Sequence, residues 1–368
     1  MTFSSREIKF QLASTTEDAE LRRLLRENPM PGAISLSLER EPSYFATRAL
    51  EGEPHQTVVA REPSGRPVGL FSRSERTAFV NGVPARVGYL GQLRLDAAYR
   101  GKLALVRAGF ERCRELHRAG GVGFYATSIV EDNGPARRLL TASLPGLPTY
   151  CELGRMITFL LEVPRRARAC SLARGTPDRL PEIAALLAES HARFQLAPAW
   201  TAEELASGDA CPGLRPEDFL LVDRGGKLAG CAALWDQRAF KQTVIRAYAG
   251  WIGRARPLMN AAAAILGRPG LPGIGAQLSH AYLSHFAARG DDPAVAGALL
   301  DAGLADARRR GIDFLSLGLA DGHPLARAAR RRREREYPSR IYAVHWDDGA
   351  HAVEALDERP VHLEVATL

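Results

Sequence analysis

Arg100, Gly101 and Lys102 are the residues of this chain best suited by type and spacing to bind an anion. They follow an apolar run at 87–95 that predicts a strand, and they precede apolar residues at helical spacing over 103–116. A turn between a strand and a helix offers free backbone amides and the positive end of the helix dipole, which together favour phosphate. The segment therefore predicts a phosphate site. A basic, solvent-exposed turn without a ligand is the alternative interpretation.

Groups that can move a proton follow the next apolar run, 122–130, which predicts a second strand. Glu131 lies at the end of that strand, where its carboxylate could accept a proton; a solvated loop acid is the alternative. Tyr150 could donate a proton to a leaving group, or be a core aromatic residue with its hydroxyl at the rim. Asn133 has the type and position of a helix N-cap, and the same side chain could contact a ligand.

The segment Tyr99–Leu105, with the sequence YRGKLAL, resembles the acetyl-CoA turn of the GNAT (N-acetyltransferase) superfamily, Gln/Arg-x-x-Gly-x-Gly/Ala. The family also places an Asn, an Ala and a Leu-Tyr pair after its fifth strand, where this chain has Asn133, Ala136, Leu139 and Leu140. The resemblance covers the order of elements and part of the motif positions. It implies an α/β fold class with a mixed sheet of the GNAT type.

The chain departs from the family pattern at three positions. Leu103 and Leu105 stand where small residues are expected, and their side chains could crowd the approach of the backbone to a phosphate. Leu140 replaces a Tyr that often serves as general acid in the family. The order of strand, turn, helix and strand is unaffected, so the expected fold is unchanged.

The resemblance implies that acetyl-CoA, or another acyl-CoA, donates an acyl group to an amine. The backbone around Leu93 to Leu95 would pair with the pantetheine arm as a strand does, and the turn at 100–105 would bind the pyrophosphate. The cofactor-binding residues so implied are Leu93, Arg94, Leu95, Arg100, Gly101, Lys102, Leu103, Ala104, Leu105, Asn133 and Ala136. Glu131 and Tyr150 are the expected catalytic residues, and no metal is expected.

The acceptor pocket of GNAT proteins is shaped by the region that corresponds here to residues 28–44. Glu39 and Glu41 could attract an amine, and Tyr44 could form a wall. Tyr89 and Gln92, on the strand before the turn, are further candidates for contact with the substrate. The alternative for this region is a loop followed by a helix over 41–51. The expected acceptor is an amine of a small molecule or a peptide.

The second half repeats the layout of the first at an offset of about 190 residues. A strand over 277–286, a helix over 294–310 and a strand over 312–319 follow one another as they do in the first half. The repeat predicts two tandem GNAT-like domains, with a CoA-binding domain at 1–163 and a second domain at 164–368.

The second half differs from the first at its turn, where Asp291 and Asp292 stand in place of basic residues. Like charges about 4 Å apart at an effective dielectric near 20 repel by roughly 4 kcal/mol, which would abolish pyrophosphate binding. Carboxylates at a helix N-terminus also stabilise the helix dipole. We therefore expect Asp291 and Asp292 to be helix caps, and the second domain to be non-catalytic or to shape the substrate site.

Composition excludes several classes of protein. The chain has 368 residues, of which 46% are hydrophobic and 25% charged, as is typical of a globular protein. No apolar run approaches the roughly 20 residues that span a bilayer, and the first residues do not resemble a signal peptide, so the cytoplasm is the expected location. Five cysteines without CxxC spacing predict neither a disulfide framework nor a zinc site.

Two other functions are compatible with the sequence. A Fem-type aminoacyl transferase also has two GNAT-like halves and uses charged tRNA, and the pI of about 9.4 and the arginines at 330–333 suit a polyanion. Against it, Fem proteins have no CoA turn, so nucleic acid is not the expected partner. A catalytically silent GNAT-fold binding protein is the other alternative, motivated by Leu140 and the missing glycines.

Overall fold

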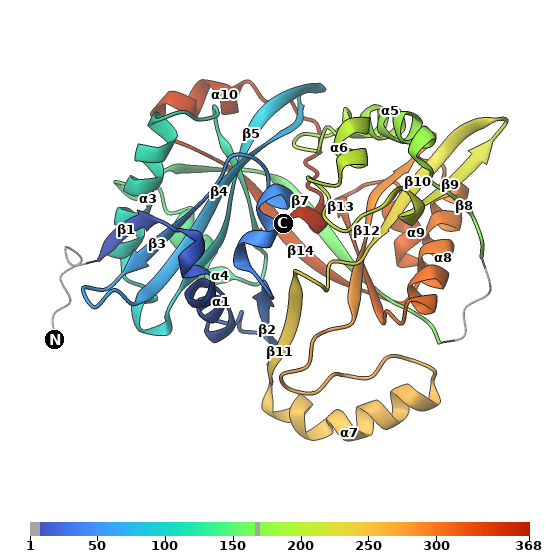
Figure 1. The fold of residues 1–368 in the computed structure, drawn as a ribbon, viewed down its shortest axis with the longest axis horizontal. Helices are drawn as coiled ribbons and strands as arrows, with labels where there is room; N and C mark the ends of the chain where they lie inside the picture. The colour runs from blue at the N-terminus through green and yellow to red at the C-terminus, as the bar shows by residue number, and fades with distance from the viewer. Residues whose placement is uncertain (1–7, 166–169) are drawn as a thin grey trace.

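The computed structural model describes residues 8–165 and 170–368. Within these residues, one mixed sheet runs through both halves of the chain, in the strand order β1-β3-β4-β5-β6-β14-β7-β13-β12-β10-β9-β8 (Figure 1). The strands are β1 (Lys9–Leu12), β3 (His55–Arg61), β4 (Pro67–Val80), β5 (Val83–Leu95), β6 (Tyr125–Val130), β7 (Thr149–Glu162), β8 (Ala173–Arg174), β9 (Phe219–Arg224), β10 (Lys227–Trp235), β12 (His280–Ala288), β13 (Phe314–Ala320) and β14 (Glu334–His345). The expected α/β class with a mixed sheet is confirmed.

Helices cover both faces of this sheet. The helices of the described residues are α1 (Asp18–Glu27), α2 (Arg48–Glu51), α3 (Leu103–Arg118), α4 (Gly134–Leu140), α5 (Leu180–His191), α6 (Ala202–Ser207), α7 (Gly250–Ile265), α8 (Pro293–Arg309), α9 (Ala326–Arg330) and α10 (Ala350–Glu354), of which α7 lies away from this sheet (Figure 1). The predicted helices over 103–116 and 294–310 correspond to α3 and α8. Among the described helices, none combines the length and apolar character needed to cross a membrane.

The period of two along each strand explains why helices pack on both faces. In β9, Leu220 belongs to the core beneath α8, whereas its neighbours Phe219 and Leu221 belong to the core beneath α5. In β10, Leu234 and Trp235 divide in the same way, and both are fully buried. Strands that are apolar on both faces require a helix on each, so the sequence of the second half specifies a three-layer arrangement.

The two halves exchange their last strands. β14, near the end of the chain, lies between β6 and β7, with Ile341 opposite Ser128 on one side and Ser339 opposite Met156 on the other. β7 in turn pairs with β13 of the second half. The backbone hydrogen bonds of each half are therefore completed by a strand from the other. The domain boundary expected at residue 163 remains a prediction.

A second, two-stranded sheet also joins the halves. β2 (Ile34–Glu39) pairs antiparallel with β11 (Gln242–Tyr248), and α7 follows β11 on an arm that projects from the main body (Figure 1). The helix expected over 41–51 is shorter than predicted: a 3-10 turn over Tyr44–Thr47 precedes α2. The Ser43 hydroxyl caps this turn by accepting the Phe45 amide at 3.2 Å, so the turn begins three residues later than expected.

We expect fragments 1–163 and 164–368 to lack cooperative unfolding when they are separate and to regain it when they are mixed. The first fragment lacks β14, which leaves β6 and β7 without their shared partner, and unpaired backbone in a sheet interior is costly. Circular dichroism during urea titration would measure this. Cooperative unfolding of the first fragment alone would contradict the expectation.

Candidate functional site

β5 and β6 form a fork, defined here as the parts of these two parallel strands beyond their last paired residues. Their pairing is confined to Gly88 with Tyr125 and Tyr89 with Ala126. The Thr127 hydroxyl donates to the Leu90 carbonyl at 2.8 Å, and within the described residues no ladder pair follows. The predicted pantetheine-binding residues Leu93, Arg94 and Leu95 all lie on the part of β5 that pairs with β4 but not with β6. This first fork therefore offers backbone groups to a ligand.

A β-bulge bends β5 at the fork. Leu70 of β4 pairs with Arg94 and Ser72 pairs with Gly91, so β5 has one residue more than β4 between these pairs. Gln92, within the bulge, has a left-handed φ of 55°. Its side-chain amide donates to the Glu51 carboxylate, which holds this unusual backbone in place.

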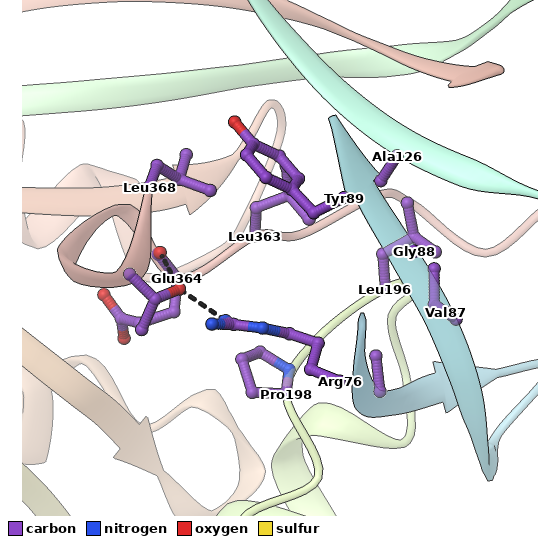
Figure 2. A pocket seen from close by; sticks show the side chains of 12 residues that line it. Arg76, Val87, Gly88, Tyr89, Ala126, Leu196, Pro198, Leu363, Glu364 and Leu368 are labelled. Atoms are coloured by element: carbon purple, nitrogen blue, oxygen red, sulfur yellow. Dashed lines mark hydrogen bonds between the residues drawn. The ribbon is translucent and has the colours of Figure 1, made fainter. Parts of the chain in front are cut away.

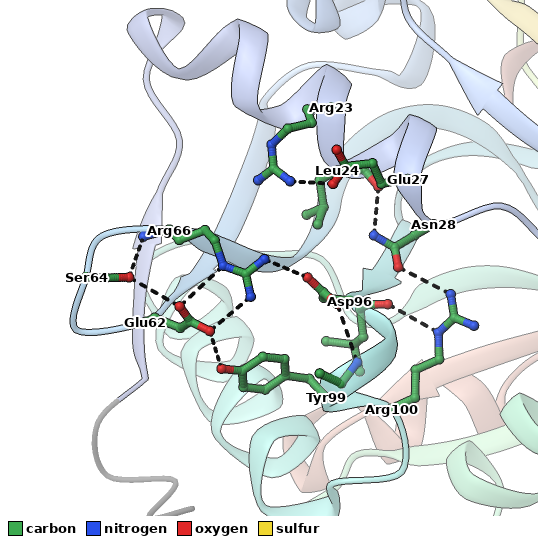
Figure 3. Close-up of polar contacts among 12 residues, drawn as sticks. Arg23, Leu24, Glu27, Asn28, Glu62, Ser64, Arg66, Asp96, Tyr99 and Arg100 are labelled. Atoms are coloured by element: carbon green, nitrogen blue, oxygen red, sulfur yellow. Dashed lines mark hydrogen bonds and ion pairs between the residues drawn. The ribbon is translucent and has the colours of Figure 1, made fainter.

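The predicted phosphate turn leads from β5 into α3 (Figure 3). Gly101 has a φ of 76° and open space around its Cα, so the turn is exposed where an anion would approach. The Arg100 guanidinium donates to the Leu95 carbonyl and to the Asn28 side chain, both at 3.3 Å, and Lys102 lies 4.5 Å from the centroid of the Tyr99 ring. Two positive charges are thus held at the helix N-terminus, where the first amides have no intrahelical acceptor.

The two leucines that depart from the family pattern lie differently. Leu105 is buried in the core with Ile8 and Tyr99, so its side chain does not occupy the turn. Leu103 is half-buried and Ala104 is exposed. Crowding by Leu105, which the sequence led us to expect, is therefore wrong because that side chain faces the sheet.

The residues at the turn fit the pyrophosphate of CoA. Arg100 and Lys102 come from one turn at the start of one helix, and the nearby Asp96 carboxylate is paired with Arg66. An anion with several oxygens, rather than a carboxylate alone, would use both cations.

Asn133 caps α4, as one of its two predicted roles required. Its side-chain oxygen accepts the Ala136 amide at 3.3 Å. Asn133 is exposed and Ala136 is half-buried, after the end of β6. Contact of Asn133 with a ligand remains a prediction.

Glu131 is held by two arginines. Arg340 donates to its carboxylate at 2.8 Å, and Arg155 does so at 3.0 Å. Hydrogen bonds from Arg340 and Arg155 lower the pKa of Glu131, which makes its carboxylate a weaker base. The geometry therefore favours a structural pairing between β6, β7 and β14 for this residue, and its catalytic role remains a prediction.

Tyr150 is half-buried and packs against the core between α3 and the sheet. Its ring packs edge-on against Phe110, with centroids 6.4 Å apart, and against Tyr342 at 6.0 Å. Burial raises the pKa of the Tyr150 hydroxyl. This placement matches the core aromatic that was the alternative interpretation, and its role as proton donor remains a prediction.

The acidic residues predicted to attract the acceptor are already paired. Glu39 is buried and accepts hydrogen bonds from Arg246 and Ser37, and Glu41 pairs with Arg22. Tyr44 is also buried, and its hydroxyl lies 3.2 Å from that of Thr57. The structure therefore does not bring Glu39, Glu41 and Tyr44 together around an open space.

Glu51, which the sequence did not single out, lies at the centre of a buried polar cluster. Arg40 donates to its carboxylate at 2.8 Å, and the His55 ring nitrogen lies 3.0 Å away. Burial alone would raise the pKa of Glu51, but the charges and hydrogen bonds of Arg40 and His55 lower it to about 2. Glu51 thereby connects Arg40 to the bulge residue Gln92.

A small hollow of about 20 Å³, room for roughly one water molecule, lies beside this cluster, at the base of the first fork (Figure 2). Gly88, Tyr89 and Ala126 line one side, and Glu364 and Leu368 lie across from them. Tyr89 is thus the one predicted substrate residue that lines the hollow. Arg76 also lines it and donates to Thr367 and to the Leu50 carbonyl, which fixes its guanidinium there.

Two further buried ionisable groups belong to this region. Glu364 accepts the His285 amide at 3.0 Å and the Ala366 amide at 3.1 Å, and burial raises its pKa. Burial also lowers the pKa of Lys241 well below its ordinary range, and its ammonium donates to the Ala366 carbonyl at 3.3 Å. A carboxylate of raised basicity and an amine of lowered basicity are typical of sites that move protons.

The sequence contained a weak signal for this cluster. Lys241 is one of only four lysines in an arginine-rich chain. Arg73, Glu75 and Arg76 are charged residues inside a strand that is otherwise apolar enough to be buried. Charged residues in such a strand require partners, but the partners come from distant segments and could not be named in advance.

The second half contains a second fork, formed by β12 and β13. These strands pair only from His280 with Phe314 to Tyr282 with Ser316, and His285, 193 residues after Gln92, has a φ of 50° in an equivalent bulge. The C-terminal segment fills this second fork: its Glu364 accepts the His285 amide, and a Cβ on Gly318 would lie 2.4 Å from Val365. The second fork has no room for a pantetheine arm.

The turn of the second half is capped by one aspartate, not two. Asp292 accepts the amides of Ala294 and Val295 at 2.7 and 3.2 Å, as predicted. Asp291 instead forms an ion pair with Arg193 at 2.6 Å, so its predicted role as a helix cap is wrong. The first amides of α8 donate to Asp292 because that residue is in the N-cap position.

We expect Glu51→Gln to lower the free energy of unfolding at pH 7 by about 3–5 kcal/mol, because it leaves Arg40 buried without its counter-charge. Since the folded-state pKa of about 2 lies below the ordinary 4.5, the contribution of Glu51 is present above pH 4.5 and is lost as the pH falls towards 2. Urea titrations at pH 7 and pH 3 should therefore show that the free energy of unfolding falls less for the variant than for the unmodified chain. Glu115→Gln, at an exposed ion pair, is the control, and an equal effect of both would contradict the assignment.

No family model matches the sequence, and no curated protein does. Solved structures do match in fold. N-myristoyltransferase of Saccharomyces cerevisiae with bound myristoyl-CoA aligns with a TM-score of 0.61 and 13% identity over 94% of this chain and 84% of that one.

Two further structures give the same result. A GCN5-related N-acetyltransferase from Sphaerobacter thermophilus has a TM-score of 0.52 and 12% identity over 92% of this chain and 95% of that one. A GCN5-related glucosamine N-acetyltransferase region of a fungal multi-domain GH3 β-N-acetylglucosaminidase has a TM-score of 0.58 and 9% identity over 91% of this chain and 38% of that one. The fold of this chain is that of the GNAT superfamily.

Proposed function

We propose that this chain is an acyl-CoA-dependent N-acyltransferase whose donor binds in the first half. The observation that carries the proposal is the first fork, with its bulge at Gln92, followed directly by a basic turn at the start of α3. Unpaired strand edges and a positive helix N-terminus suit the two ends of CoA, an amide-containing arm and a pyrophosphate. The fold that this chain shares with acyltransferases supports acyl transfer, although one fold can host several reactions.

In this proposal the pantetheine arm lies along Leu93, Arg94 and Leu95, and the pyrophosphate lies against residues 100–105. Asn133 and Ala136 flank the same end of the sheet, at the start of α4. The donor supplies a thioester, which is already activated for attack. The protein's tasks are therefore to align an amine with it and to move protons.

Acyl transfer forms an N–C bond and breaks the C–S bond. The attacking amine loses a proton to a base, and the departing thiolate takes one up. We propose that the acceptor amine approaches the hollow and that Glu364 accepts its proton through a water molecule there, since Glu364 lines the hollow, the hollow has room for about one water, and burial raises the pKa of Glu364. Glu131 and Tyr150 are the sequence-based alternatives for the base and the acid.

The acyl group and the acceptor are open within this proposal. Acetyl-CoA is the donor that the sequence resemblance implies, and a longer acyl chain is the alternative, because Leu103 and Leu105 depart from the usual turn. The acceptor is proposed to be an amine of a small molecule or a peptide. The solved structures described above give no support to a Fem-type aminoacyl transferase.

We expect release of free CoA thiol when the protein is incubated with acyl-CoA and a panel of amines and peptide N-termini. Acetyl-, octanoyl- and myristoyl-CoA would each be tested. Glu364→Gln should lower kcat about 100-fold, the lower end of the usual effect of a general base, with little change in donor affinity. Glu358→Gln, an exposed residue of the same segment, is the control.

This assay distinguishes an acyltransferase from a protein that only binds acyl-CoA. Donor binding without turnover for any amine would instead support a silent GNAT-fold binding protein. Turnover that Glu364→Gln leaves unchanged would keep the enzyme but remove Glu364 as its base.

We expect Arg100→Glu with Lys102→Glu to weaken acyl-CoA binding at least tenfold, which is about 1.4 kcal/mol. The reason is that both charges lie at the turn proposed to bind the pyrophosphate. Calorimetry would measure the affinity and the stoichiometry, which should be one site per chain.

Two control variants accompany this measurement. Arg114→Glu with Arg118→Glu makes the same charge change near the other end of α3 and should leave affinity nearly unchanged. Asp291→Lys with Asp292→Lys, in the turn of the second half, should not lower it either. Two equivalent sites per chain, or lost binding in the aspartate variant, would show that the halves are assigned wrongly.

A further inference from the structure

The arm that carries α7 presents an apolar surface to solvent. Trp251, Leu258 and Ile265 are 69%, 77% and 87% exposed, and Leu266 and Ile274 are each more than 60% exposed. Scattered single residues of this kind are normal on protein surfaces, but a contiguous group is typical of an interaction site.

These side chains form one stripe along the helix, because Trp251, Leu258 and Ile265 are each seven residues apart. Ala255 and Ala262 fall between them on the same face. Ile252, on another face, is buried. The helix thus has apolar residues on its solvent side, the reverse of an ordinary surface helix.

The arm is fixed in this orientation. Asn260 exchanges two hydrogen bonds with Leu271, at 3.0 and 2.7 Å, and Arg256 donates to the Pro272 carbonyl at 2.8 Å, so the returning loop covers the polar face. At its root, Arg246 of β11 donates to Ser37 of β2 at 2.8 Å. The exposed stripe is therefore held outward by contacts on the opposite side of the helix.

The charge of the arm selects among the surfaces that could cover the stripe. Residues 249–276 contain Arg254, Arg256 and Arg268 and no acidic residue. Arg268 pairs with Glu162 of the body, and Arg256 is turned to the opposite side of the helix, so Arg254 is the cation beside the stripe. A second copy of this chain would bring two such positive charges together, whereas a bilayer with anionic lipid attracts the arginine.

We propose that this arm docks the protein on an anionic membrane surface, with the stripe of Trp251, Leu258 and Ile265 in the headgroup region. A helix of 16 residues is too short to span a bilayer but suits the interface plane, where tryptophan is favoured and arginine meets phosphate groups. The inference does not depend on the proposed enzymatic function.

Co-sedimentation with vesicles of phosphatidylcholine, with and without phosphatidylglycerol, tests the proposal on the full chain. We expect binding to the anionic vesicles that weakens as salt is raised. Leu258→Glu with Ile265→Glu should reduce the partition coefficient at least about tenfold, because two charges would enter an apolar interface. Leu12→Glu with Val83→Glu, at exposed apolar residues outside the arm, is the matched control and should bind as the unmodified chain does.

Tryptophan fluorescence gives an independent measurement. Trp200, Trp235 and Trp346 are buried, so a blue shift on adding anionic vesicles would come from Trp251 and should be absent in Trp251→Phe. Lack of binding to anionic vesicles, or equal binding by the Leu258/Ile265 variant, would overturn the proposal. Self-association that this variant abolishes, without vesicle binding, would also overturn it in favour of a second copy of the chain.

Discussion

The exchange of β7 and β14 is the constraint on which the rest of the structure depends. Because β14 pairs with β6 and β7 pairs with β13, the chain crosses between the halves three times. After β14 the chain must return from the first half, and its last residues then enter the second fork. The hollow beside Tyr89 is consequently built by both halves, which no arrangement of two independent domains would produce. The exchange also holds the two halves rigidly together, since moving one half relative to the other would break backbone hydrogen bonds between their strands.

The same architecture allows several charges to be buried together. Removing Glu51 or Lys241 from water is unfavourable, and the structure offsets this with Arg40 on one side and backbone carbonyls of the C-terminal segment on the other. The sheet determines the positions of the segments that carry these partners. The charged side chains are therefore fixed in one orientation. A site whose polar groups are already oriented loses little free energy in reorganising when a substrate binds.

The sequence predicted what depends on local pattern. The apolar periods around 87–140, the glycine-containing turn and the repeat about 190 residues later specify elements that the structure contains. It could not predict which strands pair, because the sequence of a strand such as β14 does not identify its neighbours in the sheet. For the same reason Glu39 and Glu41 were expected to be available to an amine: their partners Arg246 and Arg22 lie far away in the chain. Leu105 was expected at the turn because spacing alone does not reveal which face of a helix meets the sheet.

The two forks share a local geometry but differ in what occupies them. Both have a bulge with one left-handed residue, Gln92 in the first and His285 in the second. In the second fork, Glu364 accepts the amide of His285, so the backbone there is already satisfied from within the chain. Within the described residues, no side chain accepts a hydrogen bond from the backbone amide of Gln92. The difference between the two halves therefore has two causes: the acidic turn of the second half and the C-terminal segment that fills the second fork. A segment of the chain occupies one fork, and its carboxylate, held by that contact, lines the hollow at the base of the other.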